Sequence, residues 1–244
     1  MLITTSETTN NIETLRGLFD NATKNIKADA LSFIDGIRNK KTARAFIGLS
    51  KNSKMPAYTF AIPARLTCPR GDKLAQVKGT VCSGCYATKG HDAMKPAIQA
   101  KQRRWNVADL AANNWSIRQL WIEAFVIALN GEAFFRWHSA GDLYSDEYRD
   151  LVSEAIYNTP ATSHWIPTRE ARMAKGLTKH SNAVVRVSDD IVDQKTNKWQ
   201  GNTSGVHVMG GRGTECGAYL NEGQCGDCRA CWNPDVKHVS YKLH

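Results

Sequence analysis

The 244-residue sequence predicts an α/β fold built on one parallel sheet. From residue 133 onward, short apolar segments bounded by turn residues alternate with helical segments, which is the pattern of βα units. Apolar residues make up 42% of the chain, enough for one substantial core, so global disorder is excluded. The alternation favours a barrel or partial barrel within a single α/β core.

The first part of the chain predicts helices and then extended structure. Apolar residues recur at helical spacing over residues 10–40, so we expect residues 1–45 to form an N-terminal helical extension. Three prolines follow and indicate extended chain and turns: Pro56, Pro63 and Pro69. Two further helices are expected, at residues 93–112 and 114–129.

The rest of the chain supplies the sheet. Four strands are expected at residues 133–138, 164–167, 183–187 and 206–209, with helices at 146–157 and 170–177. These elements place the α/β core at residues 46–213. A cysteine-rich segment, residues 214–244, follows it.

Each predicted strand ends in polar residues. The groups are His138 to Asp142, Thr168-Arg169, Ser188 to Asp190 and Gly210 to Gly213. Ligands of parallel α/β folds bind beyond the carboxyl ends of the strands, so these residues outline a pocket rim. Ordinary turns and helix caps use the same residue types. His138 is either catalytic or a hydrogen-bonded structural residue.

The formal net charge of +9 is uneven along the chain. Through residue 130 there are 19 Lys and Arg against 9 Asp and Glu, and beyond it 13 against 14. A basic half is a footprint of nucleic-acid binding, because Lys and Arg release counterions from phosphates. A solvated basic surface is the other interpretation.

Export and membrane insertion are not indicated. The first residues lack the order of a signal peptide, and the longest apolar stretch, residues 121–129, includes Glu123. A span needs about 20 residues. We therefore expect a cytoplasmic protein with no membrane partner. In a reducing compartment, seven cysteines favour metal binding over disulfides.

The cysteines form two sets, and their spacing is the strongest chemical signal. The first set is Cys68, Cys82 and Cys85; the second is Cys216, Cys225, Cys228 and Cys231. Two residues between thiolates let both reach one metal centre, as in zinc and iron–sulfur sites. The tight spacing of the second set favours an iron–sulfur cluster over zinc.

The first set has only three cysteines. A [4Fe–4S] cluster held by three thiolates leaves one iron open for a substrate or cofactor. A zinc site completed by His91, or a fourth ligand from the second set, are the alternatives.

Several motifs resemble the bacteriophage family called gene product 88, from about residue 46 to the end. They are Asn52-Ser53-Lys54, Cys68-Pro69, the stretches 82–90 and 136–145, Pro167-Thr168-Arg169 and Arg186-Val187-Ser188-Asp189. The stretch from Cys82 to Ala87 also resembles the core motif of radical S-adenosylmethionine (SAM) enzymes.

The second resemblance implies a fold and a site. It implies a partial (β/α) barrel with an open-iron [4Fe–4S] cluster on Cys68, Cys82 and Cys85, at which SAM binds and is cleaved. It further implies that Tyr86 lies near the adenine, Gly141 and Asp142 near the methionyl amine, and Arg169 and Ser188 near the ribose or carboxylate.

Three functions follow from these observations. The first is a radical-SAM-like iron–sulfur enzyme in the host cytoplasm, with a second cluster on the C-terminal set, an electron donor and a nucleic acid or nucleotide as substrate. The second is a zinc-stabilised module that binds nucleic acid or a host protein without catalysis. The third is an electron-transfer or redox-sensing iron–sulfur protein.

Overall fold

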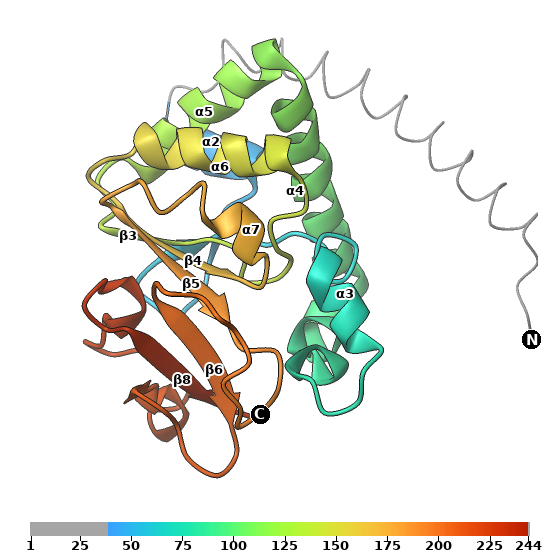
Figure 1. The fold of residues 1–244 in the computed structure, drawn as a ribbon. Coiled ribbons are helices and arrows are strands. Elements are labelled where there is room, and N and C mark those ends of the chain that lie inside the picture. Colours follow the sequence, from blue (N-terminus) through green and yellow to red (C-terminus); the bar gives the residue numbers. More distant parts are fainter. Residues whose placement is uncertain (1–38, 244) are drawn as a thin grey trace, which may run out of the picture.

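The computed structural model describes residues 39–243, and the helices expected over residues 10–38 lie outside this range. Within it, eight strands form one sheet in the order β1-β2-β3-β4-β5-β6-β8-β7 (Figure 1). All neighbouring strands are parallel except the antiparallel pair β1 and β2. The strands are β1 (Ser50–Lys51), β2 (Tyr58–Thr59), β3 (Phe134–Arg136), β4 (Ser163–Thr168), β5 (Ala183–Ser188), β6 (Thr203–His207), β7 (Thr214–Glu215) and β8 (His238–Lys242). An α/β fold with a mostly parallel sheet is confirmed.

The helices of the described range begin and end where local chemistry requires. Asn39 caps the first of them through the Thr42 amide, and Gly48 ends it in the left-handed conformation. Asn114 and Ser145 cap two others. The α-helices are α2 (Lys40–Ile47), α3 (Pro69–Ala75), α4 (Lys95–Asn113), α5 (Trp115–Leu129), α6 (Asp146–Tyr157) and α7 (Ala171–Ala174). Short 3-10 helices are η1 (Val81–Gly84), η2 (Tyr86–Thr88), η3 (Gly90–Ala93), η4 (Gly217–Leu220) and η5 (Ala230–Trp232).

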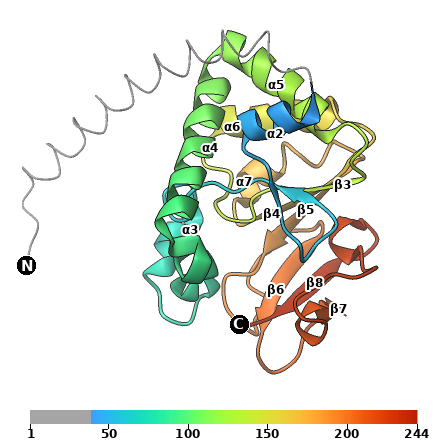
Figure 2. The same ribbon diagram turned by 180° about the vertical axis from the view of Figure 1, so that it is seen from behind.

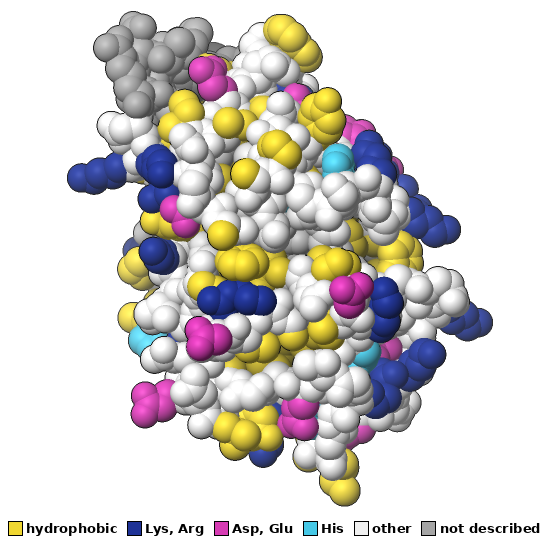
Figure 3. All heavy atoms as spheres, turned by 90° about the vertical axis from the view of Figure 1, so that its left-hand side faces the viewer, with side chains coloured by type: hydrophobic (Ala, Val, Ile, Leu, Met, Phe, Trp, Pro, Cys, Tyr) yellow, Lys and Arg dark blue, Asp and Glu magenta, His cyan; other side chains and the backbone are white. Residues whose placement is uncertain are grey.

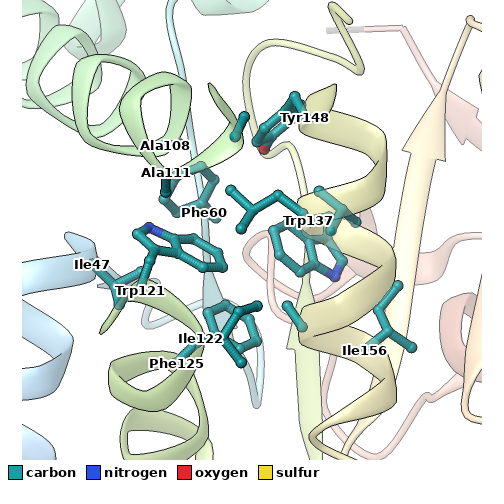
Figure 4. Packing of buried hydrophobic residues seen from close by; sticks show 14 of the residues in the cluster. Ile47, Phe60, Ala108, Ala111, Trp121, Ile122, Phe125, Trp137, Tyr148 and Ile156 are labelled. Atoms are coloured by element: carbon teal, nitrogen blue, oxygen red, sulfur yellow. The ribbon is translucent and has the colours of Figure 1, made fainter. Parts of the chain in front are cut away.

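The main core lies between the sheet and the helices. In both ribbon views α2, α5 and α6 gather at the end of the molecule opposite β6 and β8 (Figures 1 and 2). Phe125 stacks between Trp121 and Trp137, with ring centroids 5.0 and 5.2 Å apart (Figure 4). All three side chains are fully buried, so large aromatic surfaces fill this layer.

The opposite face of the sheet is covered by the C-terminal segment. Successive side chains on a strand alternate between faces, so His164 packs with the main core while Trp165 points the other way. Trp165 contacts Trp232 edge-to-face at 5.3 Å, and the Trp232 indole N–H donates to the Phe135 carbonyl at 2.9 Å. A second, smaller core therefore attaches η5 to the sheet.

The expected segment boundaries fall inside packed elements. The boundary at residue 45 lies within α2, whose Ile47 is fully buried in the main core. Residues 214–244 supply β7 and β8 to the same sheet. The fourth expected strand begins at Thr203 rather than 206, because Thr203 and Ser204 pair with β5 and β8. Across residues 39–243, no helix has the length and apolarity needed to cross a membrane.

Candidate metal centres

The first set of cysteines lies in the loop after β2, at the edge where the parallel strands end. Cys68 directly precedes α3, Cys82 lies in η1, and Cys85 follows η1. Thirteen residues separate Cys68 from Cys82, yet their sulfur atoms meet beside Gly71. A Cβ atom at position 71 would lie 3.9 Å from the Cys68 sulfur and 3.5 Å from the Cys82 sulfur. Gly71 therefore leaves the space that a side chain would fill next to both sulfurs.

The η1 turn is attached to the end of β5. The Val81 amide donates to the Asp190 carbonyl at 2.8 Å, and Thr80 forms an isolated antiparallel bridge with Ile191. The Thr80 hydroxyl donates to the Leu74 carbonyl at 2.7 Å and accepts from the Ser83 amide. These bonds hold Cys82 against the end of α3, so the position of the loop is set by the sheet.

Burial makes Cys68 and Cys82 poor acids. Burial, together with the negative charges of Asp142, Cys85 and Cys82, raises the pKa of Cys68 to about 12. The pKa of Cys82 is also raised, mainly by burial, although Arg169 lowers it. The three thiols thus act on one another electrostatically. A bound metal would have to displace their protons, so its affinity would rise with pH.

The three cysteines of the first set can be compared with the zinc and iron–sulfur centres that the sequence predicts. Among the residues of the described range, no three His, Cys, Asp or Glu side chains are arranged to hold a metal ion. A tetrahedral zinc site brings its sulfurs within about 3.8 Å of one another. A cubane distributes its thiolates over four irons and needs a wider spacing. The Cys68 and Cys82 sulfurs border the space beside Gly71, and Cys85 lies close enough to affect the pKa of both, which suits the wider spacing better than zinc.

Charged side chains at the ends of β4 and β5 surround this loop. Asp190 accepts hydrogen bonds from the Arg70 side chain at 2.5 and 3.3 Å, and lies 3.6 Å from Arg169. The Arg70 amide donates to Glu170 at 2.6 Å. The Arg169 guanidinium also donates to the Asp189 carbonyl. This network connects α3, β4 and β5, and it places Arg169 close enough to Cys82 to affect its pKa.

Asp142 and Gly141 lie on the floor of the same region. The Asp142 carboxylate accepts from the Thr168 hydroxyl at 2.5 Å and from the Arg169 and Leu143 amides at 2.8 and 2.7 Å. Burial raises its pKa to about 6. A Cβ at Gly141, whose φ is +82°, would lie 2.3 Å from Ile62. Both residues are used in packing the strand end, so any ligand contact of Asp142 adds to three existing bonds.

The other expected SAM contacts lie around this floor. Tyr86 is 61% exposed, and its hydroxyl donates to the Ser139 carbonyl. Ser188 is half-buried and forms a hydroxyl pair with Ser204 at 3.0 Å. His138 is buried, contacts the Tyr148 hydroxyl at 3.1 Å, and has its pKa lowered to about 3 by burial. His138 is therefore neutral at pH 7.

The fourth expected strand end forms only a small cavity. It measures about 20 Å³, enough for a single water molecule, and Asp193, His207, Arg212 and Ser240 are among the residues that line it. Arg212 also pairs with the buried carboxylate of Asp189. The cavity at this end of β6 is therefore too small to hold a ligand larger than water.

The second set of cysteines lies on the opposite face of the sheet. The Cys216 amide donates to the Ser240 carbonyl of β8 at 2.8 Å, and the Cys225 amide donates to the Lys54 carbonyl at 2.9 Å. The Cys231 sulfur lies 3.3 Å from the Tyr241 hydroxyl. Burial raises the pKa of Cys231 to about 11, while Tyr241, Arg186 and Arg136 act to lower it.

The two sets do not form one site. α3 lies on one side of the molecule and β8 on the other in both ribbon views (Figures 1 and 2). No cysteine of the second set contributes to the pKa shifts of Cys68 or Cys82. The alternative in which the second set lends a fourth ligand therefore has no support in this arrangement. His91, the other suggested ligand, is exposed.

Several basic residues of the first half have structural partners. Arg44 bonds to Glu132 at 2.7 Å, Arg104 to Ser50 at 2.7 Å, and the buried Lys101 to Asp92 at 2.7 Å. On the face drawn in Figure 3, basic and acidic side chains are interspersed. The charge excess therefore includes cations that hold the helices to the loops, and this face carries no continuous positive field.

Comparison with known proteins decides the family. The family described as gene product 88 matches residues 31–234, which is more than half of the chain. The chain belongs to the gene product 88 family. This confirms the expected phage family, and the match begins earlier than the expected residue 46. No curated protein and no solved structure matches the chain. All seven cysteines of this gene product 88 protein lie within the matched range.

Sequence reasoning missed three residues that build these regions. Gly71 and Arg70 shape the first region together with Asp190, which the polar end of the third expected strand already included, and Arg186 lies under the second. Arg186 had a readable signal, since it is the one charge in the apolar strand segment Ala183–Ser188. Gly71 lies three residues after Cys68 but carries no signal of its own.

Proposed function

We propose that this gene product 88 protein is an iron–sulfur enzyme with an open-iron [4Fe–4S] cluster on Cys68, Cys82 and Cys85. We further propose that it binds SAM at that cluster and that the sheet is a partial barrel of the radical SAM kind. The observation that carries the proposal is the approach of the Cys68 and Cys82 sulfurs to the space beside Gly71, with Cys85 close enough to affect the pKa of both, at the carboxyl edge of a parallel sheet.

The sheet order supports this reading of the architecture. From β2 to β6 each strand lies beside the one before it, so the chain winds in one direction with its helices on one face. This is the winding that a partial barrel requires. Ligands of such folds approach the carboxyl edge, which is where the first set lies.

Held by Cys68, Cys82 and Cys85, such a cluster would supply an electron to bound SAM. The chain's own groups would then orient the cofactor. Arg169 is held by the Asp189 carbonyl and by Asp190, so its cation is fixed close to Cys82 and suits a carboxylate. The exposed ring of Tyr86 lies directly after Cys85 and offers a flat apolar surface for a base.

Anaerobic purification followed by metal analysis and EPR tests the proposal. We expect a brown protein with a band near 400 nm and about eight irons per chain if both sets hold cubanes. Adding SAM should change the EPR spectrum of the reduced protein, because only an open iron can bind it. Cys82→Ser should abolish this response, whereas the control Cys228→Ser should retain it.

Three results would contradict the proposal in different ways. A protein that contains zinc and no iron would be a zinc-stabilised module. An iron-containing protein whose EPR spectrum ignores SAM would be an electron carrier or sensor. A SAM response that survives Cys82→Ser would place the open iron elsewhere.

A further inference from the structure

Arg186 is a fully buried cation in the middle of β5. Its guanidinium donates to the backbone carbonyls of Ala230 at 2.8 Å, Asn233 at 2.9 Å, Val236 at 2.8 Å and Cys231 at 3.1 Å, with a longer bond to Thr203 at 3.4 Å. Four of these carbonyls belong to the segment that follows Cys228. The side chain therefore fixes the backbone on which Cys231 lies.

No ion pair with a residue of the described range offsets this charge. Each other fully buried large side chain of the described range is apolar or a tyrosine, whereas Arg186 carries a full charge and lies within 4.0 Å of no Asp or Glu carboxylate. Carbonyl dipoles satisfy its N–H groups but carry no net negative charge. A buried charge without an opposite charge is costly.

A second arginine on the same face of the sheet, Arg136, also lacks an opposite charge among the described residues. Arg136 places its guanidinium over Trp165, 4.5 Å from the ring, and its buried Nε atom has no hydrogen-bond partner. It also forms no ion pair among the described residues. Arg136 lies close enough to Cys225 and Cys231 to affect the pKa of both.

Cys231 is a shared neighbour of these two cations, and Cys225 is a further neighbour of Arg136. As neutral thiols the cysteines of the second set offset nothing. As four thiolates on one metal centre they carry a net negative charge, whether the metal is zinc or a [4Fe–4S] cubane. We propose that Cys216, Cys225, Cys228 and Cys231 bind such an anionic metal–thiolate centre, and that the buried Arg186 and the half-buried Arg136 are the countercharges that stabilise it.

The proposal explains why two arginines lie beneath a cysteine-rich segment. The Tyr241 hydroxyl, 3.3 Å from the Cys231 sulfur, can donate to a thiolate there. The centre would join β7 and η5 through Cys216 and Cys231, and β8 through Tyr241 beside Cys231. The inference rests on the proposed function only for the identity of the metal, because the charge balance is the same for zinc and for iron.

Chelator challenge of the full-length, metal-loaded protein tests the charge balance. The variants are Arg186→Met, which removes the charge, and Arg186→Lys, which keeps it but loses most of the carbonyl bonds. We expect Arg186→Met to release the metal of the second set at a chelator concentration lower by about tenfold or more. Arg186→Lys should stay close to the wild type. Arg172→Met, at an exposed arginine on α7, is the control for net charge.

Thermal unfolding with and without chelator gives a second readout. In the wild type, metal removal leaves Arg186 uncompensated, so the melting temperature should fall. This fall should be smaller in Arg186→Met, which has no buried charge to expose. Arg136→Met should reduce chelator resistance in the same direction, and it keeps the test decisive should Arg186→Met not fold.

Each remaining outcome overturns the inference. Unchanged metal content in Cys228→Ser would mean that the second set binds no metal. Wild-type chelator resistance in Arg186→Met or, if that variant does not fold, in Arg136→Met would mean that the buried cations do not stabilise the centre. Equal losses in Arg186→Lys and Arg186→Met would assign the effect to hydrogen bonds. None of these depends on SAM, so failure of the proposed function appears separately as an EPR spectrum that SAM leaves unchanged.

Discussion

Replacing Gly71 separates the folding of α3 from the loading of the first cysteine set. Gly71 lies inside α3 and has a helical rather than a left-handed backbone, so alanine is conformationally acceptable there. Alanine favours a helix over glycine by up to about 1 kcal/mol. The added Cβ, however, would lie 3.0 Å from the Cys68 Cβ and 3.5 Å from the Cys82 sulfur.

The two effects have opposite signs. In the metal-free protein, Gly71→Ala should keep or slightly raise the melting temperature. Its iron content should fall, because the Cys68 side chain must move by a few tenths of an ångström. Gly71→Val adds two further methyl groups beside the sulfurs and should remove the first cluster, a loss of about four irons per chain.

Gly84→Ala is the matched control for this experiment. Gly84 lies between Cys82 and Cys85, and a Cβ there would meet nothing within 4 Å. We expect normal iron content in this variant. Iron analysis after anaerobic reconstitution, with melting curves of the metal-free proteins, measures both effects. Wild-type iron loading in Gly71→Val would refute the role given to this space.

Two further predictions concern the sheet. Burial lowers the pKa of His164 to about 3, below its usual 6.5, and the Trp137 indole N–H donates to its Nδ1, so the folded protein holds it neutral. The contribution of His164 to stability is complete above pH 6.5 and is lost as the pH falls toward 3. Urea unfolding at pH 5 should show a free energy of unfolding lower by about 2 kcal/mol because of this residue, and His164→Gln should flatten the dependence of stability on pH. Asp190→Asn should lower the free energy of unfolding by about 2 kcal/mol and reduce iron loading, because it removes the charge that joins Arg70 to Arg169. The control Asp146→Asn, which also bridges two arginines but is 44% exposed, should lose less than 1 kcal/mol, and equal losses in both variants would contradict the argument.

Periodic segments of the fold were predictable from the sequence. The helix expected at residues 146–157 matches α6, and the strand expected at 183–187 matches β5 to within one residue. Both have strong hydrophobic patterns, which local reasoning reads well. β8 was missed because it follows a stretch of glycine, cysteine and proline that reads as loop. Its pairing with β6 is a tertiary contact that no local pattern reports.

The two cysteine sets could be recognised from the sequence, whereas their surroundings could not. The spacing of the cysteines identified both sets, since adjacent thiols leave a local signal. The meeting of Cys68 with Cys82 depends on the turn after α3, and the attachment of that turn depends on Asp190, more than 100 residues away. Arg186 is close to Cys231 only because η5 folds back across the sheet. Such long-range contacts follow from the assembled fold.

The strand order also fixes when each set of cysteines can be assembled during synthesis. The segments that hold the first set, from β2 to β5 and the loop through Ile191, are translated before the second set. The second set must wait longer, because Cys216 is attached to Ser240 and β8 inserts between β6 and β7. Until β8 is in place, Cys216 lacks the strand to which its backbone is attached. For that interval, oxidation and binding to a wrong metal compete directly with folding.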